Sequence, residues 1–135
     1  MSKGDPRFLA ILDEMKEIHV RKSADYGDQT DPLANVRASA DWGISPWVGT
    51  MIRATDKIIR LQSLLTNGKL ENESARDSLI DLASYAIIAL ILMEEEQMEE
   101  EQKKVNEQIS QVHNKLTEYA GKAYKQDNFD PDGLC

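Results

Sequence analysis

Apolar residues recur at helical spacing along most of the chain. Near the N-terminus they fall three and four positions apart between Phe8 and Ile18, directly after Asp5-Pro6. An aspartate followed by proline at the first helical position favours the start of a helix. We therefore predict a helix from Pro6 to about Lys22.

A second helix is predicted from Trp47 to about Thr66. Ser45-Pro46 precedes it as a cap and a first-turn proline, and Asn67-Gly68 follows it as a C-terminal signal. The segment between the two helices contains two glycines and a proline, so it cannot form one helix. Residues 33–40 are expected to form a short helical turn inside it. Loops of this length in compact domains tend to carry function.

The third predicted helix begins near Asn72 and reaches at least Met93. It leads into a run of six glutamates within residues 94–101, which is helical by propensity and too acidic for a core. From Met98 onward, apolar positions alternate by four and three, which is a heptad pattern with Gln102 in one core position. The apolar members of this heptad seam are Met98, Val105, Ile109, Val112, Leu116, Tyr119 and Ala123.

These patterns predict an all-α fold, with three to four antiparallel helices in a bundle and a long C-terminal heptad-patterned helix. No strand-like alternation of β-branched residues occurs. The bundle is expected over residues 1–93, an acidic helix with a coiled-coil-like oligomerisation seam over 94–125, and a flexible tail over 126–135. The seam favours self-association, and both folding back onto the same bundle and crossing to another subunit remain open.

Charge changes this picture only locally. The net charge is −8, and of the 24 acids six lie in the glutamate run, which leaves 18 against 16 bases. The acidity argues against broad nonspecific binding to nucleic acid, so we predict no nucleic-acid partner. The length of 135 residues suits one domain with a real core.

The compartment is predicted to be cytoplasmic. Cys135 is the only cysteine, so the sequence offers no intrachain disulfide and no cysteine metal cluster, which suits a reducing environment. The first residues lack an apolar signal core. The longest apolar stretch, residues 79–93, is too short for a membrane span and contains Asp81, so we predict no membrane partner.

Four polar residues share one stripe of the third predicted helix. Glu73, Asp77, Asp81 and Tyr85 are four residues apart, which stacks them on one helical face beside apolar neighbours. Like charges at this spacing repel, and a half-buried carboxylate is costly without a partner. A divalent cation would resolve both problems, and oxygen ligands favour Mg²⁺ or Mn²⁺. The alternative is a solvated face with local pairing to Arg76.

The second predicted helix carries further charges. Asp56 could add a carboxylate across the helix interface, while Arg53, Lys57 and Arg60 could meet an anionic ligand such as a phosphate. In the alternative interpretation, Asp56 pairs with Arg60 within the helix and the bases are solvated.

The first predicted helix and the loop after it offer weaker candidates. Glu17 is either a further metal ligand or a partner of Arg21, one turn away. The Lys22-Ser-Ala-Asp-Tyr-Gly-Asp loop could clasp a nucleotide, with Lys22 on a phosphate, Tyr26 against the base or ribose, and Gly27 for close backbone approach.

Four motifs together resemble the phage-associated nucleotide modification domain. They are Lys22-x-x-Asp-Tyr-Gly27, Pro32-Leu-Ala-Asn-Val-Arg37, Arg53-x-x-Asp-Lys-x-x-Arg-Leu61 and Glu73-Ser-x-x-Asp-x-Leu-x-Asp-Leu-Ala-x-Tyr-Ala86. The resemblance covers about residues 7–93, and the acid-rich last motif is its most specific part. The domain is similar in turn to the all-α nucleoside triphosphate pyrophosphohydrolases, the MazG-like and dimeric dUTPase kind.

The resemblance implies a Mg²⁺-dependent nucleotide pyrophosphohydrolase of phage nucleotide metabolism, acting in the host cytoplasm as a homo-oligomer. The residues it implies for the metal are Asp56, Asp77, Asp81 and Glu17. Glu73 and Asp77 are the implied catalytic residues, with Glu73 as a further ligand or as the base that orients water. The residues implied for nucleotide binding are Lys22, Tyr26, Arg53, Lys57 and Arg60.

This chain departs from the family pattern in its ligand spacing. The family is expected to carry Glu-x-x-Glu and Glu-x-x-Asp on two neighbouring helices, whereas here Arg53-x-x-Asp56 stands on one helix and the acids from Glu73 to Asp81 are four apart on the other. Two alternatives therefore stay open. One is a nucleotide-binding protein that has lost hydrolysis. The other is a non-catalytic helical assembly or regulatory phage protein, in which the long acidic helix is the working part and the acid stripe is a salt-bridged interface.

Overall fold

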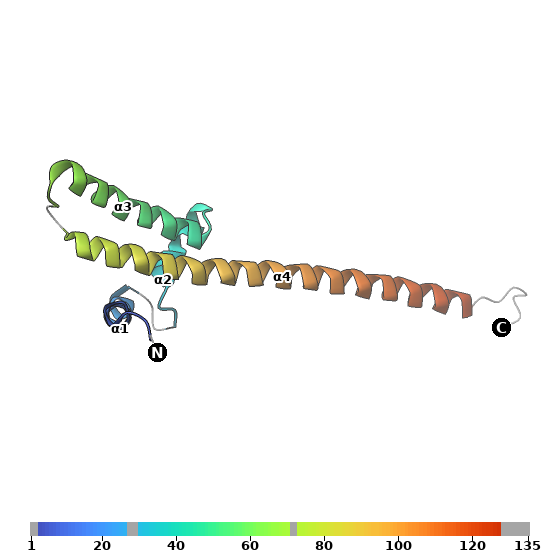
Figure 1. Cartoon of the computed structure of the whole chain (residues 1–135). Helices are drawn as coiled ribbons and strands as arrows, with labels where there is room; N and C mark the ends of the chain where they lie inside the picture. The colour runs from blue at the N-terminus through green and yellow to red at the C-terminus, as the bar shows by residue number, and fades with distance from the viewer. Residues whose placement is uncertain (1–2, 27–29, 71–72, 128–135) are drawn as a thin grey trace, which may run out of the picture. The chain divides into compact units, whose positions relative to one another are not determined.

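The predicted all-α class is confirmed by a computed structural model of the chain, which describes residues 3–26, 30–70 and 73–127. Four α-helices and one short 3₁₀ helix are present, and no strand occurs among the described residues. In chain order they are α1 (Pro6–Tyr26), α2 (Ala34–Arg37), η1 (Ala38–Trp42), α3 (Pro46–Asn67) and α4 (Ala75–Asp127) (Figure 1).

Local signals explain where α1 and α3 begin and end. Asp5 Oδ1 accepts a hydrogen bond of 2.8 Å from the backbone N–H of Arg7, which satisfies one donor in the first turn of α1. α3 starts at Pro46 and is ended by Gly68, whose φ of 76° lies in the left-handed region. The N–H of Gly68 donates to the carbonyl oxygen of Leu64, as in a glycine C-cap.

Two boundaries differ from the sequence predictions. α1 continues one turn beyond Lys22, to Tyr26, because the intervening residues include neither glycine nor proline. α4 begins at Ala75, and Asn72, the predicted start, lies outside the described residues. Ser74 explains the observed start, since its Oγ accepts a hydrogen bond of 3.0 Å from the backbone N–H of Asp77.

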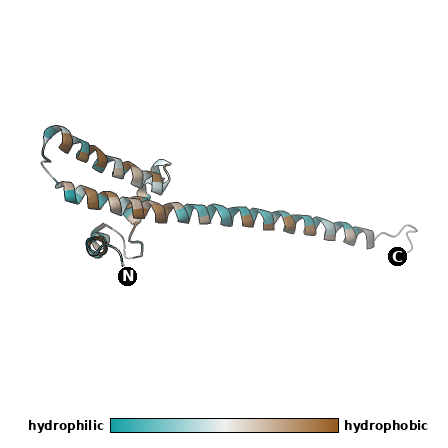
Figure 2. Cartoon of the chain, viewed as in Figure 1, coloured by the Kyte–Doolittle hydropathy of each residue, from teal (hydrophilic) through white to brown (hydrophobic). Residues whose placement is uncertain are grey.

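The acidic run does not interrupt α4, which is a single helix of 53 residues. Residues 93–120 contain neither glycine nor proline, and they are rich in glutamate, glutamine and lysine, which favour helix. The chain divides into two units, Met1–Glu94 and Glu95–Cys135. Figure 2 shows that the hydropathy changes along α4, from mostly apolar positions in its first part to mostly polar positions with isolated apolar ones in its second part.

In the first unit, α3 lies antiparallel to the first part of α4, and α1 crosses α4 (Figure 1). Small side chains allow a close approach of the helices, and Thr50, Ser78 and Ala54 are almost fully buried. A Cβ added at Gly49 would lie 2.6 Å from the Cβ of Ser39, so glycine is needed where α3 meets η1. The remaining buried side chains are Met15, Val36, Ile80, Ala89 and Leu92.

Many large apolar side chains of the first unit stay exposed in the single chain. They include Phe8, Leu9, Ile52, Ile59, Leu79, Ile87 and Leu90. None of the described helices is long and apolar enough to cross a membrane. Few apolar side chains are buried among the described residues of the first unit, so its core is small.

Candidate functional site

One lysine joins two acids at the interface of α3 and α4. The Nζ of Lys57, on α3, lies 2.9 Å from Oε1 of Glu73 and 3.0 Å from Oδ2 of Asp81. Glu73 precedes α4 and Asp81 lies in its second turn. The three side chains are only 15–19% exposed, so a single ammonium neutralises two largely buried carboxylates.

Further donors complete the pairing of each acid. Lys22, at the C-terminal part of α1, places its Nζ 2.9 Å from Oδ1 of Asp81. The Nε of Arg60 lies 3.7 Å from Oε2 of Glu73, and the buried hydroxyl of Ser78 donates to the same oxygen at 2.7 Å. We call these five charged side chains the lysine-centred network: Lys22, Lys57, Arg60, Glu73 and Asp81. It connects α1, α3 and α4 through buried and exposed charges.

A second ion pair fixes α1 on α4. The guanidinium of Arg76 donates two hydrogen bonds to the carboxylate of Glu14, at 2.7 and 2.6 Å. This bidentate geometry is the most specific form of an arginine–carboxylate contact. Glu14 and Lys22 are eight residues apart and therefore lie on one face of α1, which directs both toward α4.

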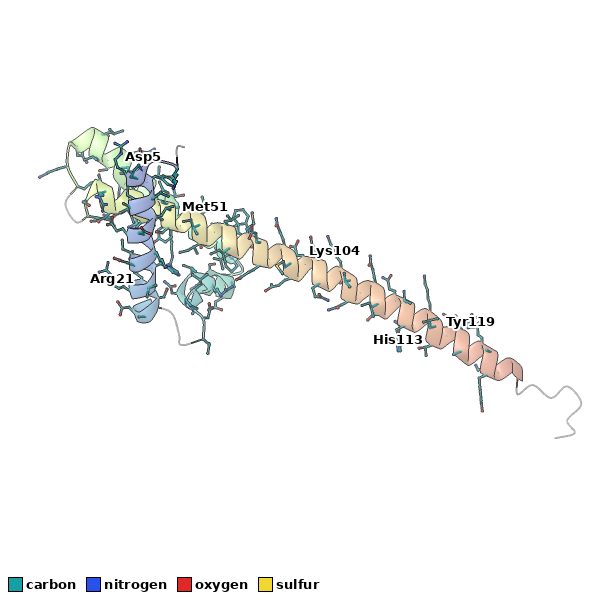
Figure 3. The ribbon with its side chains drawn as sticks, turned by 60° about the horizontal axis from the view of Figure 1, so that its bottom comes forward. Asp5, Arg21, Met51, Lys104, His113 and Tyr119 are labelled. Atoms are coloured by element: carbon teal, nitrogen blue, oxygen red, sulfur yellow. The ribbon has the colours of Figure 1, made fainter. Side chains whose placement is uncertain are left out.

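The outer part of the network borders a cavity of about 500 Å³. It lies between α1, α3 and α4, and Arg21 on α1 contributes to its lining. Figure 3 labels Arg21 near the C-terminal end of α1. The lining residues are Ile18, Arg21, Lys22, Arg60, Glu73, Asp77, Ile80 and Asp81. A second hollow of about 710 Å³ is bounded by residues of one helix alone, between Glu99 and Gln111, and is an open helix flank that cannot enclose a ligand.

The network shifts the pKa of two of its members, Asp81 and Lys57. Burial raises the pKa of Asp81, but the hydrogen bonds from Lys22 and Lys57 outweigh it and leave the pKa below its ordinary value. For Lys57, burial lowers the pKa, and the hydrogen bonds from its ammonium to Glu73 and Asp81 reverse that effect, so the pKa is raised. Both groups are therefore held in their charged forms at neutral pH.

This pairing predicts a specific loss of stability in acid. Because the folded pKa of Asp81 lies below the ordinary value of 3.8, its ion pairs stabilise the fold fully above pH 3.8 and are lost as the pH falls through the folded pKa. Asp81→Asn should be less stable near neutral pH, yet its free energy of unfolding should fall less between about pH 5 and pH 2. Urea unfolding at a series of pH values measures both effects. If the free energy of unfolding depends on pH equally in the two proteins, the ion pairs of Asp81 do not cause the loss of stability in acid.

The predicted site residues separate into two groups in the structure. Six of them meet at the network or its cavity, namely Lys22, Lys57, Arg60, Glu73, Asp77 and Asp81. Glu17, Arg53 and Asp56 are exposed and do not line the cavity. Tyr26 is the last residue of α1, and its side chain lies outside the described residues, as do residues 27–29 of the loop.

Sequence reasoning missed three contributors. Arg21, which the sequence indicates only as a partner of Glu17, lines the cavity beside Lys22. Glu14 had no assigned role, although its position one heptad and one residue before Lys22 places both on the same helical face. Ser78 is fully buried and donates to Glu73, and its place among apolar residues was the signal for a buried hydroxyl.

In the observed arrangement a lysine ammonium lies between the acids to which a divalent cation is predicted to bind. Within residues 3–26, 30–70 and 73–127, no three acidic, histidine or cysteine side chains form a group that could hold a metal. The ammonium of Lys57 already lies between Glu73 and Asp81, which are the two most buried acids of the stripe. The predicted magnesium set of Asp56, Asp77, Asp81 and Glu17 therefore stays a prediction, with only Asp77 and Asp81 at the cavity.

What the arrangement offers chemically is a hollow lined by three basic and three acidic side chains, namely Arg21, Lys22, Arg60, Glu73, Asp77 and Asp81. Arginine and lysine side chains with exposed ends can bind phosphate or carboxylate groups. Carboxylates can accept hydrogen bonds from hydroxyl or amino groups.

Searches of protein-family models, curated proteins and solved structures gave no match to the chain, so the resemblance to nucleotide modification domains stays an expectation.

Proposed function

We propose that this protein binds a nucleotide through its phosphate groups, in the cavity between α1, α3 and α4. The observation that carries the proposal is the convergence of Arg21, Lys22 and Arg60 on one cavity of about 500 Å³. That volume lies within the usual range for small-molecule pockets. The resemblance to nucleotide modification domains supports the same ligand class.

Exposure separates the cations that can receive a ligand from the one that holds the fold. The side chains of Lys22 and Arg60 are 57% and 44% exposed, so they can exchange their carboxylate partners for a phosphate at little cost. Lys57 is 16% exposed and bridges two acids, so it stays in place. We therefore assign phosphate binding to the outer cations and a structural role to Lys57.

The acids of the cavity suit the other end of a nucleotide. Asp77 is exposed and lines the cavity one turn before Asp81. Its carboxylate can accept hydrogen bonds from ribose hydroxyls or from an amino group of the base. Acids and bases in one cavity thus match a ligand that carries both phosphate groups and hydrogen-bond donors.

The resemblance implies both nucleotide binding and pyrophosphate release, and the site supports pyrophosphate release less well than binding. A Mg²⁺-assisted reaction would need carboxylates free to bind the ion. Here the buried pair, Glu73 and Asp81, shares the ammonium of Lys57. Binding without turnover is therefore the function that we propose, and turnover by Glu73 and Asp77 is an outcome of the test.

The test compares two arginines of the same helix. Arg60 lines the cavity, whereas Arg53, two turns earlier on α3, is exposed and does not. Titration calorimetry with the common ribo- and deoxyribonucleoside triphosphates, with and without Mg²⁺, should find binding to the intact chain. Arg60→Ala should weaken the affinity about tenfold or more, and Arg53→Ala should leave it within about twofold.

The outcomes separate the alternatives. Pyrophosphate should be assayed in the same samples, and Mg²⁺-dependent release that is lost in Asp77→Ala would establish the enzyme in place of the binding protein. Absence of binding by every triphosphate overturns the proposal. Equal weakening by Arg53→Ala and Arg60→Ala overturns the cavity as the site, because a general charge effect would then explain the binding.

A further inference from the structure

The second unit carries an apolar seam that the chain itself leaves exposed. Along α4, positions 98, 102, 105, 109, 112, 116 and 119 alternate by four and three, and all except Gln102 are apolar. The large apolar side chains among them are 46–74% exposed. Figure 3 shows side chains of this part of α4, including Lys104, His113 and Tyr119, projecting from the helix. A seam of this period is covered when two helices supercoil.

Charges are distributed unevenly beside the seam. In the heptad positions that flank it, the N-terminal end has Glu99 and Glu101, whereas the C-terminal end has His113, Lys115 and Lys122. Lys122 also forms an i,i+4 ion pair with Glu118, and of the two flanking lysines Lys115 lies nearer the middle of the seam. In a coiled coil, the residues in these flanking positions select the orientation of the partner helix.

We propose that two copies of this chain pair antiparallel along residues 98–119 of α4. In this orientation the acidic end of one helix lies beside the basic end of the other. One alignment pairs acidic with basic flanking residues at both ends of the seam. It places Val105 against Ile109 of the second copy, and Met98 against Leu116 of the second copy. Glu101 then lies beside Lys115 of the second copy, and Glu99 beside His113 of the second copy.

The parallel alternative is disfavoured by the same residues. In a parallel pair in register, each end of the helix lies beside the same end of the second copy. Glu99 and Glu101, in the flanking positions, would then lie beside the same acidic segment of the second copy and away from its His113, Lys115 and Lys122. Like charges at close spacing cost energy, and opposite charges at the same spacing stabilise. The second copy is therefore the partner whose charges match, and antiparallel is the orientation that matches them.

Distances between spin labels test the orientation in the full chain. With Cys135 replaced by serine, single labels are placed at Glu107→Cys, near the centre of the proposed pairing, and at Gly121→Cys, where a Cβ has open space. At about 1.5 Å per residue, the antiparallel alignment offsets the two labels at position 121 by about 42 Å along the axis, and the labels at position 107 by nearly none. Pulsed electron resonance should therefore find a much longer distance at 121.

Equal distances at the two positions would mean a parallel pair and would overturn the proposal. A chain that stays monomeric in analytical ultracentrifugation at tens of micromolar would overturn it as well. The pairing does not depend on the nucleotide proposal, since it involves no residue of the cavity.

A charge exchange tests the alignment independently. Glu101→Lys places like charges beside Lys115 of the second copy at both ends of the pair and should raise the dimer Kd about tenfold at low salt. Adding Lys115→Glu should restore the original Kd. Glu100→Lys is the matched control, because it changes the net charge equally at a position that faces away from the seam, and it should alter the Kd less than about twofold. Failure of the double variant to recover overturns the alignment.

Discussion

Lys57→Met is expected to lower the free energy of unfolding by about 2–3 kcal/mol. The substitution keeps the length and the apolar part of the side chain, but it removes the ammonium that lies 2.9 and 3.0 Å from Glu73 and Asp81. Breaking a buried ion pair costs about 3–5 kcal/mol because the remaining charge is left unpaired, and the 15–19% exposure of this group reduces that cost. Urea unfolding followed by circular dichroism measures the change.

A second substitution makes this prediction sharper. In the wild-type chain, Glu73→Gln removes the ion pair of Glu73 with Lys57 and should lower the free energy of unfolding. In the Lys57→Met chain it should stabilise by about 1 kcal/mol, because it relieves repulsion between two acids that have lost their shared cation. Lys16→Met, at an exposed position of α1, is the matched control and should change stability by less than about 0.5 kcal/mol. The same sign for Glu73→Gln in both chains would show that Lys57 does not bridge the acids.

The helices themselves could be predicted from local signals. Asp5-Pro6, Ser45-Pro46 and Asn67-Gly68 are chemical start and stop signals, and the structure places helix ends at each of them. Asp5 and Gly68 act through hydrogen bonds within a few residues, and Pro46 acts through its fixed φ in the first helical turn, so no tertiary information is needed. The one-turn error at the end of α1 has the same origin, because no residue before Gly27 breaks a helix.

The stripe of acids on α4 was also predictable, whereas the residue of α3 that pairs with these acids was not. Spacing of four residues on one helix places Glu73, Asp77 and Asp81 on one face whatever the rest of the fold does. The rotation of α3 about its own axis decides which of Asp56 and Lys57 meets that face, since adjacent helical residues point about 100° apart. The structure turns Lys57 toward the acids and leaves Asp56 exposed.

A signal for that rotation is present in hindsight. Thr50 and Ala54 are the small residues of α3 that are buried, and Lys57 continues their spacing of four and three. Small residues mark the side on which helices approach closely, so the charged residue in phase with them belongs to the interface. Asp56 lies two residues after Ala54, out of phase with this stripe, and is exposed, which is why it does not reach the site. Arg53 shares the spacing, three residues after Thr50 and four before Lys57, yet it is exposed, so the phase does not account for Arg53.

The same interface decides between a lysine and a metal ion at the acids. Since Oε1 of Glu73 and Oδ2 of Asp81 lie 2.9 and 3.0 Å from one nitrogen, they are no more than 5.9 Å apart. Oxygens bound to one Mg²⁺ on opposite sides are about 4.2 Å apart, so a small side-chain movement would let both bind. The ammonium opposes a divalent ion there by several kcal/mol, because charges of like sign within about 4 Å repel strongly even at an effective dielectric constant near 20.

Lys57→Met is therefore expected to bind Mn²⁺ about a hundredfold more tightly than the wild-type chain does, and Asp81→Asn in the same chain should abolish the gain. Titration of free Mn²⁺ by electron paramagnetic resonance measures the affinity without nucleotide, and Lys16→Met again serves as the control. Equally tight binding by the wild-type chain would show that the ion displaces the lysine. Glu73 and Asp81 would then be metal ligands after all, and the pyrophosphohydrolase would become the better supported function.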